Sequence, residues 1–529
     1  MSEPNSGYGL LSNGHACHDP DCTIDMYQLS WRLKALHEHW NKYRDELWGS
    51  SNVLAIATPP PSDDLSYLKS SAMIIWLFGC EFLETIMIIV EKQIHFLCFE
   101  EVASLLEAVK ETIQHADSLD IVVHVKSEGE DGTTQMDAIF NSIRTQLKSP
   151  VVGYIAKEAP EGKLLEMWAD KLKNSGLQLG DITHGISDIL ALKDPMEIQN
   201  ARKAAYLTAS RMKYCVVPKL EKVIYEGKKA THSSLSEETM MAVLKESENV
   251  GVCYAPIFQS GGKFDLRPSA INDDETLYYD SGSVIICALG SRYNSYCSNV
   301  ARTYLIDPTS AQMKAYEVLL KAQEAAIAAL KAGNKINAVY QAAHAVVERD
   351  APELVTNLTK SAGWGMGLEF WESGLRLNAE NDKVLKQGMV FNVSLGFQNL
   401  QAETINPKSR NFSLILADTV IVTSESCEVA TQLISKALED VAYSFNPDGE
   451  EEKHLSNALN IINEALLSRA MHRTHNQREG LERGASFVYM VKGEESDSED
   501  ERWRKKSFGK LRGLELPSIA GPSKRLKFR

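Results

Sequence analysis

Residues 277–303 read LYYDSGSVIICALGSRYNSYCSNVART, and this stretch decides the fold. The apolar, β-branched run over residues 284–288 predicts a buried strand, Gly290 predicts a turn, and the polar and aromatic residues after it predict a second strand. A lone glycine-rich stretch usually marks only a backbone bend, so the information lies in an ordered set. The stretches that complete the set are GWGMGLEFWESG from residue 363, GMVFNVSLGF from residue 388 and SLILADTVIVT from residue 413.

Together these stretches resemble five patterns of the pita-bread family of metallopeptidases, which includes methionine aminopeptidase, aminopeptidase P, prolidase and creatinase. The family patterns are D-x-G, S-D-x-x-R-T, G-H-G, E-P-G and a final E-[DN]-x-[VI]-x-V-T, and each supplies one metal ligand. The resemblance implies the pita-bread fold, but it places the ligand positions on residues of other types. These are Ala288, Asn299, Trp364, Ser394 and Ala417.

The residue types at these positions argue against metal chemistry. Two divalent cations about 3.5–4 Å apart need carboxylates and an imidazole to offset their charge and to activate the bridging water. Alanine offers no ligand atom, the indole of Trp364 is only a donor, and the neutral oxygens of Asn299 and Ser394 seldom hold hard cations without carboxylates. We therefore expect no metal, no cofactor, no catalytic residue and no enzymatic activity.

One enzymatic alternative remains open. An active, metal-dependent aminopeptidase could use displaced carboxylates, which would have to rebuild two metal shells from new backbone positions. The candidates are Asp280, Glu369, Glu372 and Glu403.

The remnant of the substrate cleft is the candidate binding site. We expect it to be lined by Arg302, Trp364, Glu369, Trp371 and Glu372. A peptide-sized groove in an acidic protein could hold extended, basic histone tails by charge and backbone hydrogen bonds. In the alternative, the two tryptophans plug the groove and binding takes place elsewhere.

Composition sets the class of partner. The chain has 529 residues, of which 44% are hydrophobic, and a net charge of −15, so it can hold two or three domains with sizeable cores. Its acidity disfavours direct, sequence-specific DNA binding and favours basic partners. Charged residues interrupt the apolar run over residues 72–99, which predicts buried strands and no membrane span.

The fold class that we expect is mixed α/β, or α+β, with an N-terminal lobe similar to that of creatinase and aminopeptidase P. Strand-like runs at residues 53–57, 72–77, 85–90, 94–99, 121–124 and 151–155 predict this lobe. A helix that begins at Pro195 and another over residues 311–332 belong to the second domain. The predicted parts are a disordered leader (1–23), the N-terminal α/β lobe (24–178), the pita-bread domain (179–441) and a largely disordered tail, acidic and then basic (442–529).

Longer strings resemble a narrower family. WRLKALHEHW from residue 31, QSGGKFDLRPSAINDDETLYY from residue 259 and LEDVAYSF from residue 438 look like the N-terminal, peptidase-like domain of the large subunit of the FACT histone chaperone, in a plant version. The resemblance covers residues 25–446. It implies a non-enzymatic, nuclear and chromosomal protein that reorganises nucleosomes during transcription, replication and repair of DNA damage. Its implied partners are core histones and an HMG-box subunit.

Beyond about residue 446 the sequence departs from this family. The dimerisation domain, the tandem pleckstrin-like module and the long acidic tail have no counterpart. We therefore expect a truncated or divergent product, and its partnership with the HMG-box subunit is in doubt.

Overall fold

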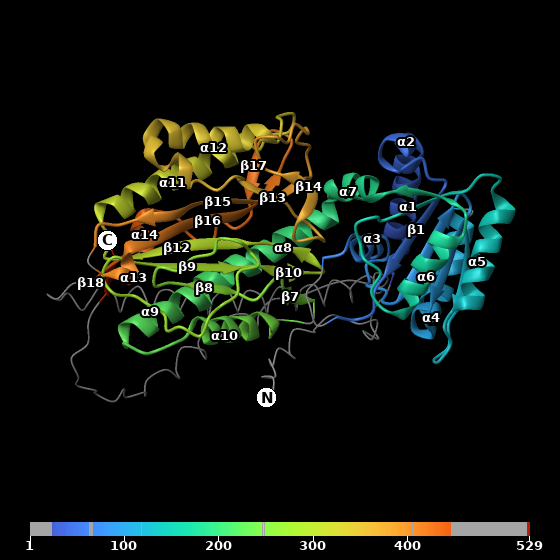
Figure 1. Cartoon of the computed structure of the whole chain (residues 1–529), viewed down its shortest axis with the longest axis horizontal. Coiled ribbons are helices and arrows are strands. Elements are labelled where there is room, and N and C mark those ends of the chain that lie inside the picture. The colour runs from blue at the N-terminus through green and yellow to red at the C-terminus, as the bar shows by residue number, and fades with distance from the viewer. Residues whose placement is uncertain are drawn as a thin grey trace, which may run out of the picture. The chain divides into compact units, whose positions relative to one another are not determined.

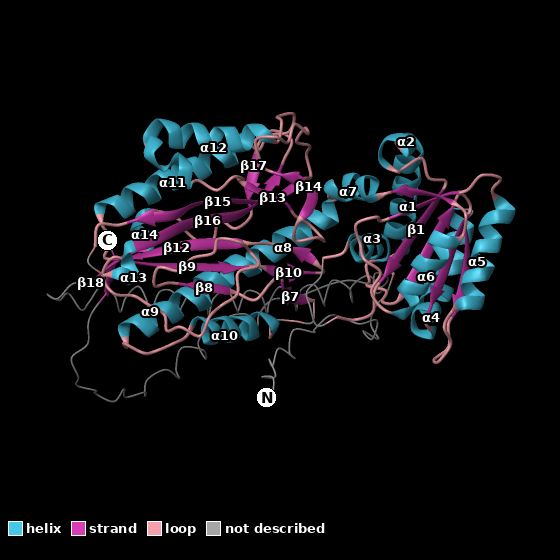
Figure 2. Cartoon of the chain, viewed as in Figure 1, coloured by secondary structure: helices cyan, strands magenta, loops and turns pink. Residues whose placement is uncertain are grey.

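The computed structural model describes residues 24–62, 67–117, 119–245, 247, 249–404, 406–445 and 526–528 (Figures 1 and 2). The predicted leader and most of the predicted tail lie outside these residues. The chain forms two compact units, and all the sites below belong to the larger one, residues 1–216 and 229–443 with the last two residues. Helix α9 (Val217–Tyr225) belongs to the smaller unit, while strand β19 (Leu526–Phe528) is the last described element.

A six-stranded sheet, in the order β4-β3-β2-β1-β5-β6, forms the N-terminal lobe. Its strands are β1 (Val53–Thr58), β2 (Thr85–Val90), β3 (Gln93–Cys98), β4 (Asp120–Val125), β5 (Val151–Tyr154) and β6 (Gln178–Asp181). The helices are α1 (Met26–Lys42), α2 (Arg44–Leu47), α3 (Lys69–Phe78), α4 (Glu100–Asp117), α5 (Thr133–Gln146), α6 (Lys163–Asn174) and α7 (Thr183–Ala191).

Both faces of this sheet are covered, which explains why its central strands are apolar throughout. Leu54 and Ile56 of β1 face a core formed with α1, α3, α4 and α7. Val53 and Ala55 face a second core formed with α5 and α6. The alternation along β1 is the two-residue period of a strand.

The prediction of a strand at residues 72–77 is wrong, because this run lies in α3. The helix is buried on nearly every side, so it lacks the amphipathic period that separates helices from strands in a sequence. It ends at Gly79, whose φ of 75° is the left-handed conformation typical of a helix C-terminus. The predicted strands at 53–57, 85–90, 94–99, 121–124 and 151–155 are confirmed within one or two residues.

The second domain contains a large mixed sheet, along which β14, β13, β15, β16 and β12 are neighbours. Strand β9 pairs with β12, β8 with β9, and β17 with β16. These strands are β8 (Ile257–Gln259), β9 (Ser283–Leu289), β12 (Val300–Ile306), β13 (Gly363–Gly365), β14 (Glu372–Arg376), β15 (Val390–Gln401), β16 (Asn411–Val422) and β17 (Cys427–Val429). A small sheet contains β7 (Val250–Val252), β10 (Ser291–Tyr293) and β11 (Tyr296–Cys297).

Helices cover this domain on more than one side (Figure 1). Helix α11 packs against β15 and β16 on one side and against α12 on the other. Helix α8 packs against the small sheet, and α10 packs against β7 and β8. The helices are α8 (Pro195–Arg211), a π-helical turn (Met212–Val216), α10 (His232–Leu244), α11 (Ser310–Ala329), α12 (Asn337–Asp350), a 3-10 helix (Pro352–Asn357), α13 (Pro407–Arg410) and α14 (Leu438–Val441). The predicted helices at Pro195 and over residues 311–332 are confirmed.

Two predicted domain limits fall at paired strands. The predicted limit at residue 178 falls inside β6, whose parallel pairing with β5 continues to Asp181. The predicted limit at residue 441 precedes β18 (Ala442–Phe445), which pairs with β12 through Leu305 and Ile306. Within the described ranges, no helix has both the length and the apolar character of a membrane span.

Candidate functional site

Three of the five positions assigned to metal ligands lie in one row across the large sheet. Ala288 pairs with Ala301, Ala301 with Ala417, and Ala417 with Ser394. Directly paired residues of antiparallel strands point to the same face, so this row presents three methyl groups and one hydroxyl. It contains no group that carries a charge.

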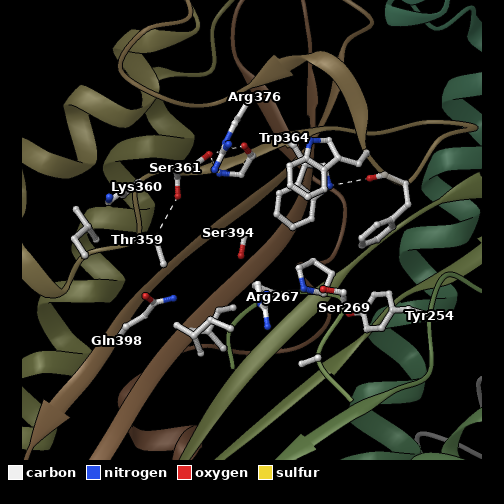
Figure 3. A pocket seen from close by; sticks show the side chains of 18 of the residues that line it. Tyr254, Arg267, Ser269, Thr359, Lys360, Ser361, Trp364, Arg376, Ser394 and Gln398 are labelled. Atoms are coloured by element: carbon white, nitrogen blue, oxygen red, sulfur yellow. Dashed lines mark hydrogen bonds between the residues drawn. The ribbon is translucent and has the colours of Figure 1, made fainter. Parts of the chain in front are cut away.

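The other two positions are occupied by side chains already bonded within the protein. Asn299 accepts a hydrogen bond from the Tyr254 hydroxyl at 2.5 Å and donates one to Asn392 at 3.1 Å. The Trp364 indole N–H donates to the Phe370 carbonyl at 2.8 Å, the dashed line beside Trp364 in Figure 3. In the part of the chain that the structure describes, no three His, Cys, Asp or Glu side chains gather in a way that suits a metal ion.

A cavity of about 920 Å³ lies over this part of the sheet (Figure 3). Ser394 and both predicted tryptophans line it, so the tryptophans form its wall and do not fill it. The rings of Trp364 and Trp371 are stacked, with centroids 5.2 Å apart and planes 22° apart. Arg376, at the end of β14, lies 6.0 Å from the ring centre of Trp371.

The charge of the lining is one-sided. Arg267, Lys360 and Arg376 line the cavity, and no Asp or Glu is among the described residues that do so. Sequence reasoning missed all three cations. The string around residue 267 did carry a signal, because it was among the segments most similar to the FACT family. Lys360 and Arg376 lie outside all the sequence stretches that were used to predict the site.

The three charged residues that we expected in the cleft do not line the cavity. Arg302 is buried against Asp418, with 2.8 Å between Nη2 and Oδ1. Glu369 is buried with Lys69 at 2.7 Å, and Glu372 is buried and ion-paired at 2.5 Å with the Lys193 ammonium.

Burial dominates the titration of both glutamates. It raises the pKa of Glu369 to about 7, although Lys69 opposes the change, and it also raises the pKa of Glu372 against the opposing effect of Lys193. Asp280 and Glu403 are exposed and do not line the cavity. The four carboxylates of the displaced-ligand alternative therefore do not converge on one site.

A hydrogen-bonded set of serine, histidine and aspartate holds the loop that carries Arg267. His232 Nδ1 contacts Asp273 at 2.5 Å, and its Nε2 contacts the Ser260 hydroxyl at 2.8 Å. These are the residue types of a hydrolase triad, but here the serine is buried and the aspartate side chain is 47% exposed. Ser260 also accepts the backbone N–H of Tyr278, so the set anchors both ends of the loop.

Comparisons with known proteins follow the same two-part organisation. Residues 24–185 match the family model of the FACT complex subunit SPT16 N-terminal lobe domain, and residues 199–424 match metallopeptidase family M24. The solved N-terminal domain of FACT complex subunit SPT16 from chickpea (Cicer arietinum) is 55% identical, with a TM-score of 0.77, and the match covers 79% of this chain and 100% of that one. The chain belongs to the SPT16 family.

Two more relatives show the extent of the SPT16 likeness. The FACT complex subunit SPT16 of Arabidopsis thaliana is 57% identical over 466 residues, which are 85% of this chain but 43% of that protein. The chain thus spans less than half the length of this curated SPT16 relative. Prolidase from Pyrococcus furiosus, at 19% identity and a TM-score of 0.55, shares the fold over 74% of this chain and 98% of its own. The predicted pita-bread fold and the predicted likeness to a plant FACT large subunit are confirmed.

Proposed function

We propose that this chain is a non-enzymatic component of FACT, a histone chaperone that reorganises nucleosomes during transcription, replication and DNA repair. Membership of the SPT16 family supports this role, because the relatives are named as FACT complex subunits. The proposed location is the nucleus, on chromosomes, and the proposed partners are core histones. An HMG-box subunit is a further proposed partner.

The observation that carries the non-enzymatic part is the uncharged row on the sheet. We propose that all five metal ligands of the metallopeptidase family have been replaced at Ala288, Asn299, Trp364, Ser394 and Ala417. Methyl groups and a hydroxyl cannot offset the charge of two divalent cations, and the amide is already bonded to protein partners. Without the metals, the fold has no means of activating water for hydrolysis.

Histone binding should use an outer surface and not the cavity. The sequence suggested that a peptide-sized groove in this acidic protein could hold basic tails, but three cations line the cavity and no described acidic residue does. Like charges across an interface disfavour binding. The net charge of −15 still favours basic partners elsewhere on the chain.

Two measurements on the full chain test this proposal. Xaa-Pro dipeptides should remain intact in the presence of Mn²⁺, Co²⁺ or Zn²⁺, and turnover that a chelator abolishes would contradict the non-enzymatic assignment. Core histones should bind saturably at about physiological ionic strength, more tightly than to an unrelated protein of equal negative charge. If the two proteins bind histones equally and both lose them with modest salt, the attraction is generic and this chain acts only as a scaffold.

A further inference from the structure

We propose that the cavity over the large sheet binds an acidic peptide segment of a partner protein. Lys360, Arg376 and Arg267 would hold its carboxylates, and the Trp364–Trp371 pair would supply the apolar wall. This site is separate from the histone-binding role proposed above and carries the opposite charge preference. Its failure would therefore leave that role untouched.

The first argument is unneutralised positive charge. Lys360 and Arg376 are exposed, and neither forms an ion pair with any described residue. Arg267 is partly neutralised, since its Nε and Nη2 contact the Asp265 carboxylate at 2.9 and 2.6 Å. Two full charges and part of a third therefore belong to side chains that line one cavity. A concave surface focuses the electric field, so a carboxylate ligand is attracted more strongly there than on a flat surface.

The second argument is free hydrogen-bonding capacity in the same place. Among the described residues, the Ser394 hydroxyl and the Gln398 side chain have no hydrogen-bond partner, although both line the cavity. Figure 3 shows Ser394 between Trp364 and Arg267, with Gln398 on the side of Thr359. A peptide needs such partners for its backbone as well as cations for its side chains.

The size and shape of the cavity fit a short peptide. At about 920 Å³ it lies near the upper end of the roughly 300–1,000 Å³ of ligand pockets. Trp371 remains 49% exposed beside the Arg376 guanidinium. Tryptophan and arginine are the residues that most often dominate the energy of protein interfaces.

A nucleic acid would also be attracted by cations and aromatic rings, but the indoles are poorly placed for it. Single-stranded nucleic acid needs open ring faces on which bases stack. Trp364 and Trp371 stack on each other, and Arg376 also contacts Trp371. The net charge of −15 further disfavours a polyanion of the length that nucleic-acid grooves bind.

The test is a fluorescence-anisotropy titration of the full chain with labelled probes at about physiological ionic strength. The probes are a peptide of about nine residues rich in Glu and Asp, its Gln and Asn counterpart, its Lys counterpart and an oligothymidylate of similar length. We expect saturable binding of the acidic peptide and at least about tenfold weaker binding of its Gln and Asn counterpart. The Lys peptide reports the outer acidic surface, so its affinity should not fall in a variant that removes the cations of the cavity. Equal binding of the acidic peptide and its Gln and Asn counterpart, or an oligothymidylate that binds more tightly and displaces the acidic peptide, would overturn the proposal.

A matched pair of charge reversals locates the site. K360E/R376E changes the cavity, and K34E/K92E changes two exposed lysines outside it by the same total charge. The cavity variant should lose about tenfold or more in affinity for the acidic peptide, whereas the control should stay within about twofold. Equal losses would mean long-range charge attraction, and K360Q/R376Q, which adds no negative charge, repeats the test if the reversals lower the melting temperature.

Discussion

Replacing Arg302 by methionine separates a structural role from the role in the cleft that the sequence suggested. The guanidinium is 1% exposed and lies between β12, β16 and the segment that follows β17. It donates to Asp418 Oδ1 at 2.8 Å. Its other acceptors are the carbonyls of Ala301 (2.9 Å), Ala417 (2.8 Å), Ile434 (2.9 Å) and Ser435 (3.0 Å).

The expected cost follows from what the substitution leaves behind. Breaking a buried ion pair by removing one partner costs about 3–5 kcal/mol. Asp418 keeps the Lys436 ammonium at 2.9 Å and the Thr431 hydroxyl at 2.9 Å, which reduces this cost. The carbonyls that lose a donor add about 1–3 kcal/mol where water cannot reach them. We therefore expect R302M to lower the free energy of unfolding by about 3–5 kcal/mol, or the melting temperature by about 6–10 °C.

The dependence on pH gives a second signature. Burial would raise the pKa of Asp418, but Arg302 and Lys436 outweigh it and hold this pKa below its usual value. A carboxylate whose pKa is lowered by folding stabilises the protein above its unfolded pKa, near about 3.9, and loses that contribution as the pH falls. Without Arg302 the pKa of Asp418 rises, so the deficit of R302M should shrink in acid.

Thermal unfolding followed by intrinsic fluorescence measures the effect. The control is R202M, since Arg202 makes an equally close, two-pronged contact with Glu428, but the two side chains are 48% and 36% exposed. That variant should lose no more than about 1 kcal/mol. The double variant R302M/D418N should be less unstable than the sum of its single variants. Our reasoning fails if R302M unfolds like the wild type while it weakens ligand binding, because Arg302 would then belong to the cleft.

Three further substitutions test the backbone, the buried charges and the cavity wall. G363A should lower the free energy of unfolding by several kcal/mol, because φ is +122° and a Cβ would lie 1.8 Å from the Asn392 carbonyl oxygen. A Cβ at Gly333 meets open space, so G333A should lower this free energy by only about 1 kcal/mol in a urea titration. Because burial raises the pKa of Glu369 to about 7, a contribution to stability that is present below about pH 4.5 is lost as the pH rises through 7, about 3 kcal/mol in total. E369Q should abolish this loss, and an unchanged dependence of the unfolding free energy on pH would contradict the burial argument. W371A should shift the melting temperature by only a few degrees yet weaken the acidic peptide about fivefold or more by anisotropy, and equal binding would remove the indole from the site.

The large sheet was predicted mainly from the resemblance of five ordered motifs to the pita-bread family, and only the strand at residues 284–288 and the strand after Gly290 came from the local pattern. Sequence reasoning failed at α3 for a physical reason: a helix that is buried all round leaves no period to detect. It also placed a domain limit inside β6. This strand contains exposed residues and a glycine, so only its pairing with β5 identifies it as a strand. Pairing is a long-range property that no local pattern contains.

The site was harder to predict than the fold. Trp364 and Trp371 were found because they lie in a motif, and Arg302, Glu369 and Glu372 were included for the same reason, although their charges are used inside the protein. A motif places a residue near a site but does not say whether its side chain faces the cavity or the core. The cations of the lining lie on loops and at a strand end, where burial and direction follow from tertiary packing alone.

The division between strands and loops also explains how the cavity could persist without the chemistry. In the peptidase family, two divalent cations and four carboxylates carry equal and opposite charge, so losing both together leaves the sum on the floor of the cleft nearly unchanged. The field in the cavity is then set by side chains on the rim, here Lys360, Arg376 and Arg267. In the peptidase family, hydrolysis depends on the positions that Ala288, Ala417 and Ser394 occupy here, while the positive charge that we propose captures an acidic ligand lies outside that row. The proposed loss of hydrolysis therefore places no physical constraint on ligand binding, and the acidic-peptide titration can succeed whether or not Xaa-Pro dipeptides remain intact.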